Sequence, residues 1–233
     1  MFIIILAGFV ATVTYNGYIE SAYRDSVSGS YTYSFTITTD SRLSNVTFFI
    51  PVPADSSGNS PMVSQFSDKT MNGVPADWKT ALFDTGKATL LKIQTPSIVP
   101  PEGTTPLHPL TITFTSNTSS RKSIDTRNPI ENAVMYHPVQ GLRDATCVMD
   151  LGNQIPCSVY TTSLYADYRS SPEAKVTIQS TLTGKNSWTV FGPHSNEYQA
   201  GLNLVMTGEN HGWVTMDGKL INSIGTYDLP AGS

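Results

Sequence analysis

The chain has 233 residues, which suits one large all-β domain or two sandwich domains of ordinary size. Hydrophobic residues make up 39% and aromatic residues 10%, enough for a packed core and too much for a disordered chain. Charged residues make up only 14%, below the roughly 25% usual in soluble domains, and the evenly spread net charge of −4 excludes an electrostatic nucleic-acid surface.

The N-terminal segment is apolar and uncharged. Residues 1–19 contain no charged side chain, and as a helix they would span about 28 Å, close to the thickness of a bilayer core. Tyrosines follow the apolar run, at the place of an interfacial aromatic belt. The pattern therefore predicts a hydrophobic anchor helix over residues 1–25, with Ile4, Phe9 and Val13 among its membrane or assembly contacts.

Two alternatives to an anchor stay open for this segment. A cleaved signal peptide would normally carry a basic n-region and a small-x-small cleavage site, and neither is evident here. A buried core strand is the other alternative. We expect residues 26–233 to lie outside the cell, because a long domain is translocated largely regardless of its charge.

Alternating apolar and polar residues predict strands in the first half of the chain. The clearest is 31–37, and together with 45–53 we expect it to form a hairpin. A second hairpin is predicted between 78–83 and 88–93, which flank a turn sequence containing Gly86.

The second half of the chain continues in the same style. Strands are predicted at 110–115, 158–165, 175–182, 187–191, 202–206 and 213–216. Asp217-Gly218 predicts a tight turn into 219–221. Strands separated by turns, without helices between them, predict an antiparallel β-sandwich over 26–233, one large or two tandem, with 121–132 as the candidate boundary.

Two cysteines and two sequons agree with an extracellular location. A bridge between Cys147 and Cys157 would close a loop of 11 residues and contribute about 2.7 kcal/mol of stability. Their spacing matches no zinc motif, so we predict a disulfide, with free thiols as the alternative. The triplets at Asn45 and Asn117 are candidate N-glycosylation sites.

No nucleophile, phosphate-loop, dinucleotide or metalloprotease motif occurs, so the sequence predicts no catalytic, cofactor or metal residue. Three weaker combinations remain as alternatives to ordinary surface or core roles for the same residues. A zinc site would use His194, Glu197, Glu209 and His211, and a calcium site would use Asp144, Asp150 and Asn153. A sugar-stacking platform would use Trp78, Trp188 and Trp213.

Two resemblances follow from these patterns. Residues 1–95, with an apolar leader, the aromatic alternating strand 31–37 and a strand ending in Pro-Val-Pro53, resemble uncharacterised exported surface proteins of archaea. An apolar helix leading into a β-rich head is also similar to the architecture of type IV pilins, although no processing site precedes the apolar run.

The sequence thus predicts a non-enzymatic cell-surface structural or adhesion protein attached to a membrane by its N-terminal helix. A pilus-like filament subunit that self-assembles through this helix is the first alternative, and a carbohydrate-binding or glycan-hydrolysing module is the second. The expected partners are a membrane, further copies of the chain or surface glycans, and no nucleic acid.

Overall fold

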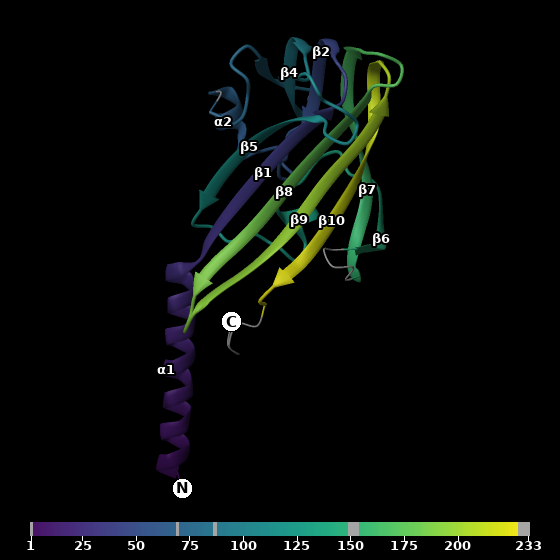
Figure 1. Cartoon of the computed structure of the whole chain (residues 1–233). Coiled ribbons are helices and arrows are strands. Elements are labelled where there is room, and N and C mark those ends of the chain that lie inside the picture. Colours follow the sequence, from purple (N-terminus) through teal and green to yellow (C-terminus); the bar gives the residue numbers. More distant parts are fainter. Residues whose placement is uncertain (1, 69, 86–87, 149–153, 228–233) are drawn as a thin grey trace.

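The computed structural model describes residues 2–68, 70–85, 88–148 and 154–227, and for residues 2–8 it describes the backbone alone. Most of the described chain is strand, and a long helix precedes the sheet, as predicted (Figure 1). The elements are α1 (Phe2–Ser26), β1 (Ser28–Thr39), β2 (Leu43–Pro51), α2 (Val63–Ser67), β3 (Lys79–Asp84), β4 (Thr89–Ile98), β5 (Leu110–Ser120), α3 (Pro129–Asn132), β6 (Gln140–Val148), β7 (Gln154–Arg169), β8 (Lys175–Thr189), β9 (Pro193–Thr207) and β10 (Asn210–Gly225).

In the part of the chain that the structure describes, ten strands form one antiparallel sheet. Its order is β3-β4-β2-β7-β10-β9-β8-β1-β5, and β6 pairs with the first half of β7. The predicted sandwich is not confirmed, because the described strands make a single curled sheet with the shape of a half-barrel. The alternation of apolar and polar residues along a strand shows only that one face of the sheet is buried. A curled sheet buries one face just as two packed sheets do, so the alternation does not distinguish them.

The connection between β1 and β2 explains the curl. These strands lie five positions apart in the sheet, which would separate them by about 24 Å if the sheet were flat. Only residues 40–42 join them, and so short a link spans at most about 14 Å. The sheet must therefore bend until the ends of β1 and β2 approach each other.

The strand partners differ from the prediction in two places. The expected hairpin of 31–37 with 45–53 is wrong, since β1 pairs with β5 and β8 while β2 pairs with β4 and β7. The expected turn at Asp217-Gly218 is also wrong, because both residues lie inside β10. The predicted hairpin of β3 with β4 is confirmed.

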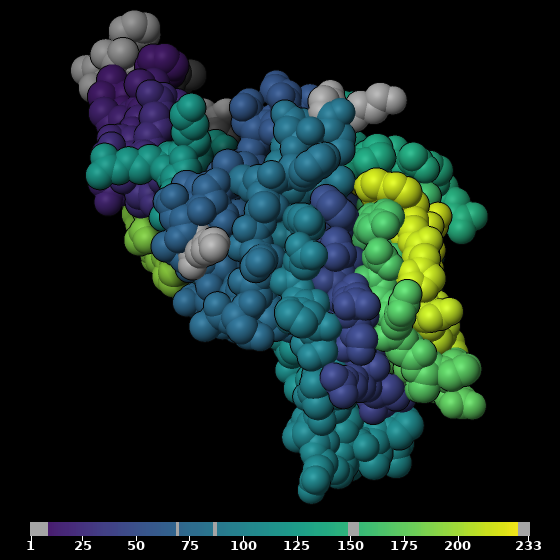
Figure 2. All heavy atoms as spheres, turned by 90° about the horizontal axis from the view of Figure 1, so that it is seen from above, coloured from purple at the N-terminus to yellow at the C-terminus, as the bar shows by residue number. Residues whose placement is uncertain are grey.

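The core lies on the inner face of the curl, where connecting segments close it. Phe35 and Phe114 stack there with ring centroids 5.8 Å apart, and Trp78 packs edge-on against Phe114 at 5.7 Å. The segment 52–78 also contributes Met62 and Phe66, both buried. In the view from above, blue and teal segments pack beside the green and yellow strands (Figure 2).

The helix α1 extends away from one end of the sheet, with the N-terminus at its far end (Figure 1). Only Val27 separates it from β1. Within the described part of the chain, no helix combines the length and the apolarity needed to cross a membrane. The membrane anchor therefore stays a prediction, and the side chain of Ile4 lies outside the described residues.

Candidate functional site

The outer face of the sheet carries a group of exposed aromatic side chains. Along β7 every second residue from Tyr160 to Tyr168 is buried, and the residues between them point outward. The register places outward residues of neighbouring strands directly opposite one another, so that they form rows across the sheet.

One of these rows is aromatic. Trp213 of β10 lies opposite Tyr165 of β7, which lies opposite Phe49 of β2. Ring centroids are 5.6 Å apart for the first pair and 5.4 Å for the second, and Phe83 of β3 packs on Phe49 at 5.7 Å, all edge-to-face. These four residues are here called the aromatic row.

The aromatic row is open to solvent. Trp213 is 60% exposed and Phe83 is 54% exposed, while Tyr165 and Phe49 are half-buried between them. The ammonium of Lys92, which lies opposite Phe49 on β4, is 5.8 Å from the centre of the Phe49 ring. This approach is within the range of a cation–π contact.

A polar row runs beside the aromatic row, two residues away from it on β10, β7 and β2. It consists of His211, Asp167, Thr47, Gln94 and Lys79, each opposite the next. We call these five residues the polar row.

An ion pair holds the end of the polar row. His211 Nδ1 is 2.7 Å from Asp167 Oδ1, and His211 Nε2 is 3.7 Å from Glu209 Oε2. The hydrogen bond to Asp167 raises the pKa of His211 above its ordinary value, and the charges of both carboxylates add to the effect.

A hollow of about 750 Å³ lies on the same outer face, over β6 to β10. Gly201 leaves its floor open, since no side chain rises from β9 at that position. Arg143, Asp217, Lys219 and Asn203 stand around it. The side chains are of mixed charge and exposed, so the hollow favours no single class of ion.

The junction of α1 with the sheet is a small apolar cluster. Ile19 is buried against Trp188 of β8 and against Val190, which follows β8 directly, and the Tyr23 ring meets Trp188 edge-on at 5.6 Å. Further out, the exposed Phe191 packs on Tyr15 and on Tyr18, with centroids 6.1 and 5.9 Å away.

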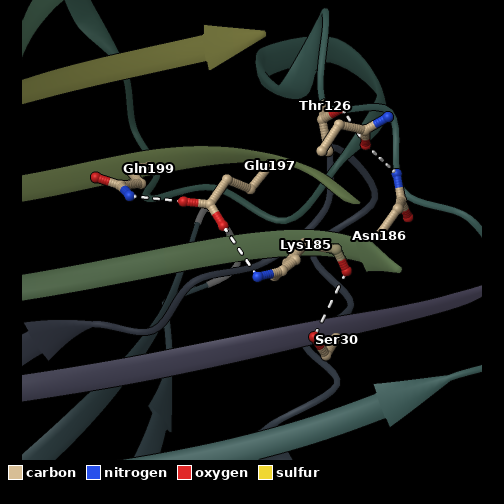
Figure 3. A network of polar contacts seen from close by, with 7 residues as sticks. Ser30, Thr126, Lys185, Asn186, Glu197 and Gln199 are labelled. Carbon is tan, nitrogen blue, oxygen red and sulfur yellow. Dashed lines mark hydrogen bonds and ion pairs between the residues drawn. The ribbon is translucent and has the colours of Figure 1, made fainter. Parts of the chain in front are cut away.

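A buried amide network ties residues 124–126 to the sheet beside this junction (Figure 3). Asn186 accepts a hydrogen bond from the Ile124 amide at 2.7 Å and donates to the Ile124 carbonyl at 2.8 Å. It also donates to Asn196 at 2.8 Å, and Thr126 donates to the same Asn196 oxygen at 2.9 Å. Segment 121–132, the candidate domain boundary, is thus bonded to the sheet at this point.

Of the predicted sites, the disulfide is confirmed. Cys147 and Cys157 are bonded, with Cα atoms 5.8 Å apart, and they join β6 to β7. This bond is compatible with an oxidising, extracellular location. Asn45 and Asn117 are both exposed, and Asn45 lies at an irregularity of β2 with φ of 56°. Their glycosylation stays a prediction.

The three tryptophans do not form one platform. Trp78 is in the main core, Trp188 is under α1, and Trp213 alone is exposed.

The four residues considered as zinc ligands, His194, Glu197, Glu209 and His211, do not come together either. His194 bonds to the Val190 carbonyl and stacks on Trp188, whereas His211 pairs with Asp167. Among the described residues, no group of three or more His, Cys, Asp or Glu side chains could hold a metal ion. Asp150 and Asn153, considered for calcium, lie outside the described residues.

Sequence reasoning missed Phe49, Tyr165 and Phe83 as surface residues. For Tyr165 the signal was the alternation of 158–165, in which Tyr165 has the opposite parity to the buried Tyr160. Comparison of the chain with protein-family models, with curated proteins and with solved structures finds no match in any of the three.

Proposed function

We propose that the protein is an exported, non-enzymatic surface protein that displays its β-sheet and is held in place through α1. The observation that carries the proposal is the exposure of apolar side chains around this helix. Phe9, Val10 and Val13 are 68%, 53% and 54% exposed. A helix that is apolar all round is stable in water only when its surface is covered.

The directions of these side chains support attachment rather than packing on the sheet. Successive residues of a helix are turned by about 100°, so Phe9, Val10, Tyr15 and Tyr18 face four different sides. The sheet contacts α1 at Ile19, Ala22 and Tyr23, near its C-terminal end. The exposed side chains of Phe9, Val10 and Val13 are then available to a lipid phase or to other helices.

The test uses the full chain with Phe9→Asp and Val13→Asp together. We expect the wild-type protein to be recovered in membranes or in assemblies, and the variant as a soluble monomer with an unchanged melting temperature. Asn16→Asp, which adds a charge at a polar position of the same helix, is the control and should behave as the wild type. A soluble, monomeric wild-type chain without detergent would refute attachment through α1.

A second candidate function is a filament subunit, favoured by the contact of Phe191 with Tyr15 and Tyr18. This contact extends the apolar surface of α1 onto the head, so neighbouring copies that pack their helices would also bring heads together. Negative-stain electron microscopy of the sheared native protein distinguishes the candidates, since uniform fibres support a filament and discrete detergent-dependent particles support a membrane-held head.

A further inference from the structure

We propose that the outer face of the sheet binds a neutral oligosaccharide, with sugar rings on the aromatic row and their hydroxyl groups on the polar row. This inference goes beyond the proposed function, because it assigns a ligand to the displayed head. It concerns recognition and includes no bond cleavage.

The first argument is the exposure and order of the rings. Aromatic side chains gathered on an open surface mark an interaction site more often than scattered ones. The edge-to-face contacts, at 5.4 to 5.7 Å, already hold the four rings in position. A ligand that binds there therefore loses little of its affinity to ordering of the protein side chains.

The second argument is the chemistry on both sides of the rings. The polar row offers the acceptor Asp167 and the amide Gln94, and on the other side Thr215 lies opposite Ser163. Rows on one face are about 7 Å apart along the strands. A pyranose has an apolar C–H face and a rim of hydroxyl groups, so it matches a stripe of rings between two stripes of hydrogen-bonding groups.

The same geometry argues against a protein partner. A helix or strand packed on this face would cover the flanking His211, Asp167 and Lys92 together with the rings. Burying such groups costs free energy unless each finds a partner. A saccharide brings a hydroxyl group to each of them and leaves the outer side in water.

Charge and length narrow the ligand further. Two lysines, Lys79 and Lys92, lie on the same face as two carboxylates, Asp167 and Glu209. Neither positive nor negative charge dominates there, so a neutral sugar is favoured over an acidic one. From β10 to β3 the row crosses five strands, or about 19 Å. That length suits a short oligosaccharide better than a single sugar.

The experiment measures binding of defined tetrasaccharides to the full-length protein in detergent. The probes are tetramers of β-1,4-linked glucose, β-1,4-linked N-acetylglucosamine and β-1,4-linked mannose, used in calorimetry and in tryptophan fluorescence. Trp213 is exposed while Trp78 and Trp188 are buried, so a change in fluorescence reports on the proposed site.

We expect at least one probe to bind and Trp213→Ala to weaken that binding roughly tenfold or more. Phe83→Ala, at the other end of the row, should weaken it as well. The control is Leu107→Ala, which removes an exposed apolar side chain outside the row and should bind as the wild type does.

The inference is overturned if none of the three probes binds, or if both aromatic variants bind as tightly as the wild type while keeping its melting temperature. The variant with Phe9→Asp and Val13→Asp should bind the probe normally. Failure of attachment through α1 and failure of sugar binding are thereby separate results.

Discussion

Two glycines inside strands make room for tyrosine rings that cross the inner face of the sheet. Gly218 lies opposite Tyr160, and Gly184 lies opposite Tyr198. A Cβ atom added at Gly218 would be 2.5 Å from the Tyr160 ring, and one at Gly184 would be 2.2 Å from the Tyr198 ring. Both glycines thus serve packing, because neither has a positive φ angle.

We predict that Gly218→Ala lowers the free energy of unfolding by about 1–3 kcal/mol, since the buried Tyr160 ring must leave its position. Urea denaturation measures the loss. Gly192→Ala is the matched control, because an added Cβ there meets no atom within 4 Å. Equal stability of the two variants would show that the Tyr160 ring shifts without cost.

At His211 we predict a pH effect with a defined sign. Asp167 raises the histidine pKa above 6.5, so the protonated form is favoured in the folded protein. The stability contributed by the pair is then complete below the unfolded-state pKa and is lost as pH rises through the folded-state pKa.

An NMR titration of the His211 imidazole checks this prediction directly. Asp167→Asn should lower the pKa of His211, and the stability difference between wild type and variant should shrink as pH rises. An unchanged pKa in Asp167→Asn would mean that the carboxylate of Glu209, 3.7 Å from His211 Nε2, is what raises the pKa of His211.

At the scale of elements, the disulfide is the covalent link between β6 and β7. Cys147 and Cys157 are buried with Ile221 in a small cluster separate from the main core. The strand β6 has no second neighbour along the described sheet, so it depends on β7 and on this bond.

We predict that replacing both cysteines by serine lowers the stability by about 2.7 kcal/mol or less, as the short loop implies. Hydrogen exchange should become faster in β6 first, while β8 and β9 stay protected. Reduction of the wild-type protein should reproduce the change and leave the double variant unaffected. Uniformly faster exchange would instead make β6 part of the global folding unit.

Strand positions were predictable, because the alternation of apolar and polar residues is a local property of the sequence. Strand partners were not predictable, because they lie far apart in the chain. The segment 31–37 alternates clearly, yet its partners β5 and β8 begin more than seventy residues further along the chain. The pair Asp217-Gly218 has turn propensity, but the opposite Tyr160 ring requires glycine within a strand. Burial and close contact thus overrode local preference.

The candidate site was less predictable than the strands. The aromatic row joins Trp213, Tyr165, Phe49 and Phe83, which come from four strands distant in sequence. Taken singly in the sequence, each of these aromatic residues would be expected in the core. The register of β10 on β7 and of β7 on β2 makes Trp213, Tyr165 and Phe49 neighbours, and Phe83 joins them by packing on Phe49. The helix α1, in contrast, was predictable, because its apolar residues are continuous in the sequence.

At the scale of the whole molecule, α1 and the sheet meet through few side chains. We predict that Ile19→Ala loosens the helix and leaves the sheet unchanged, because Ile19 is buried against Trp188 and Val190. Hydrogen exchange should become faster in residues 19–26, with no change in the melting temperature of the sheet.

The control for this change is Val13→Ala, which lies at an exposed position of the same helix and should leave exchange in residues 19–26 unaltered. A lower melting temperature of the sheet in Ile19→Ala would contradict the prediction. It would show that the helix and the sheet unfold as one unit.

The direct connection of α1 to β1 has a mechanical consequence. Tension applied to the helix passes through Val27 into a strand that is hydrogen-bonded on both sides, to β8 over Ser28–Thr39 and to β5 over Gly29–Thr39. Pulling β1 along its own length strains both ladders together, whereas an edge strand would be peeled away bond by bond. If the sheet is bound to a surface while α1 is pulled, β1, which joins the helix to the sheet, would therefore resist the force.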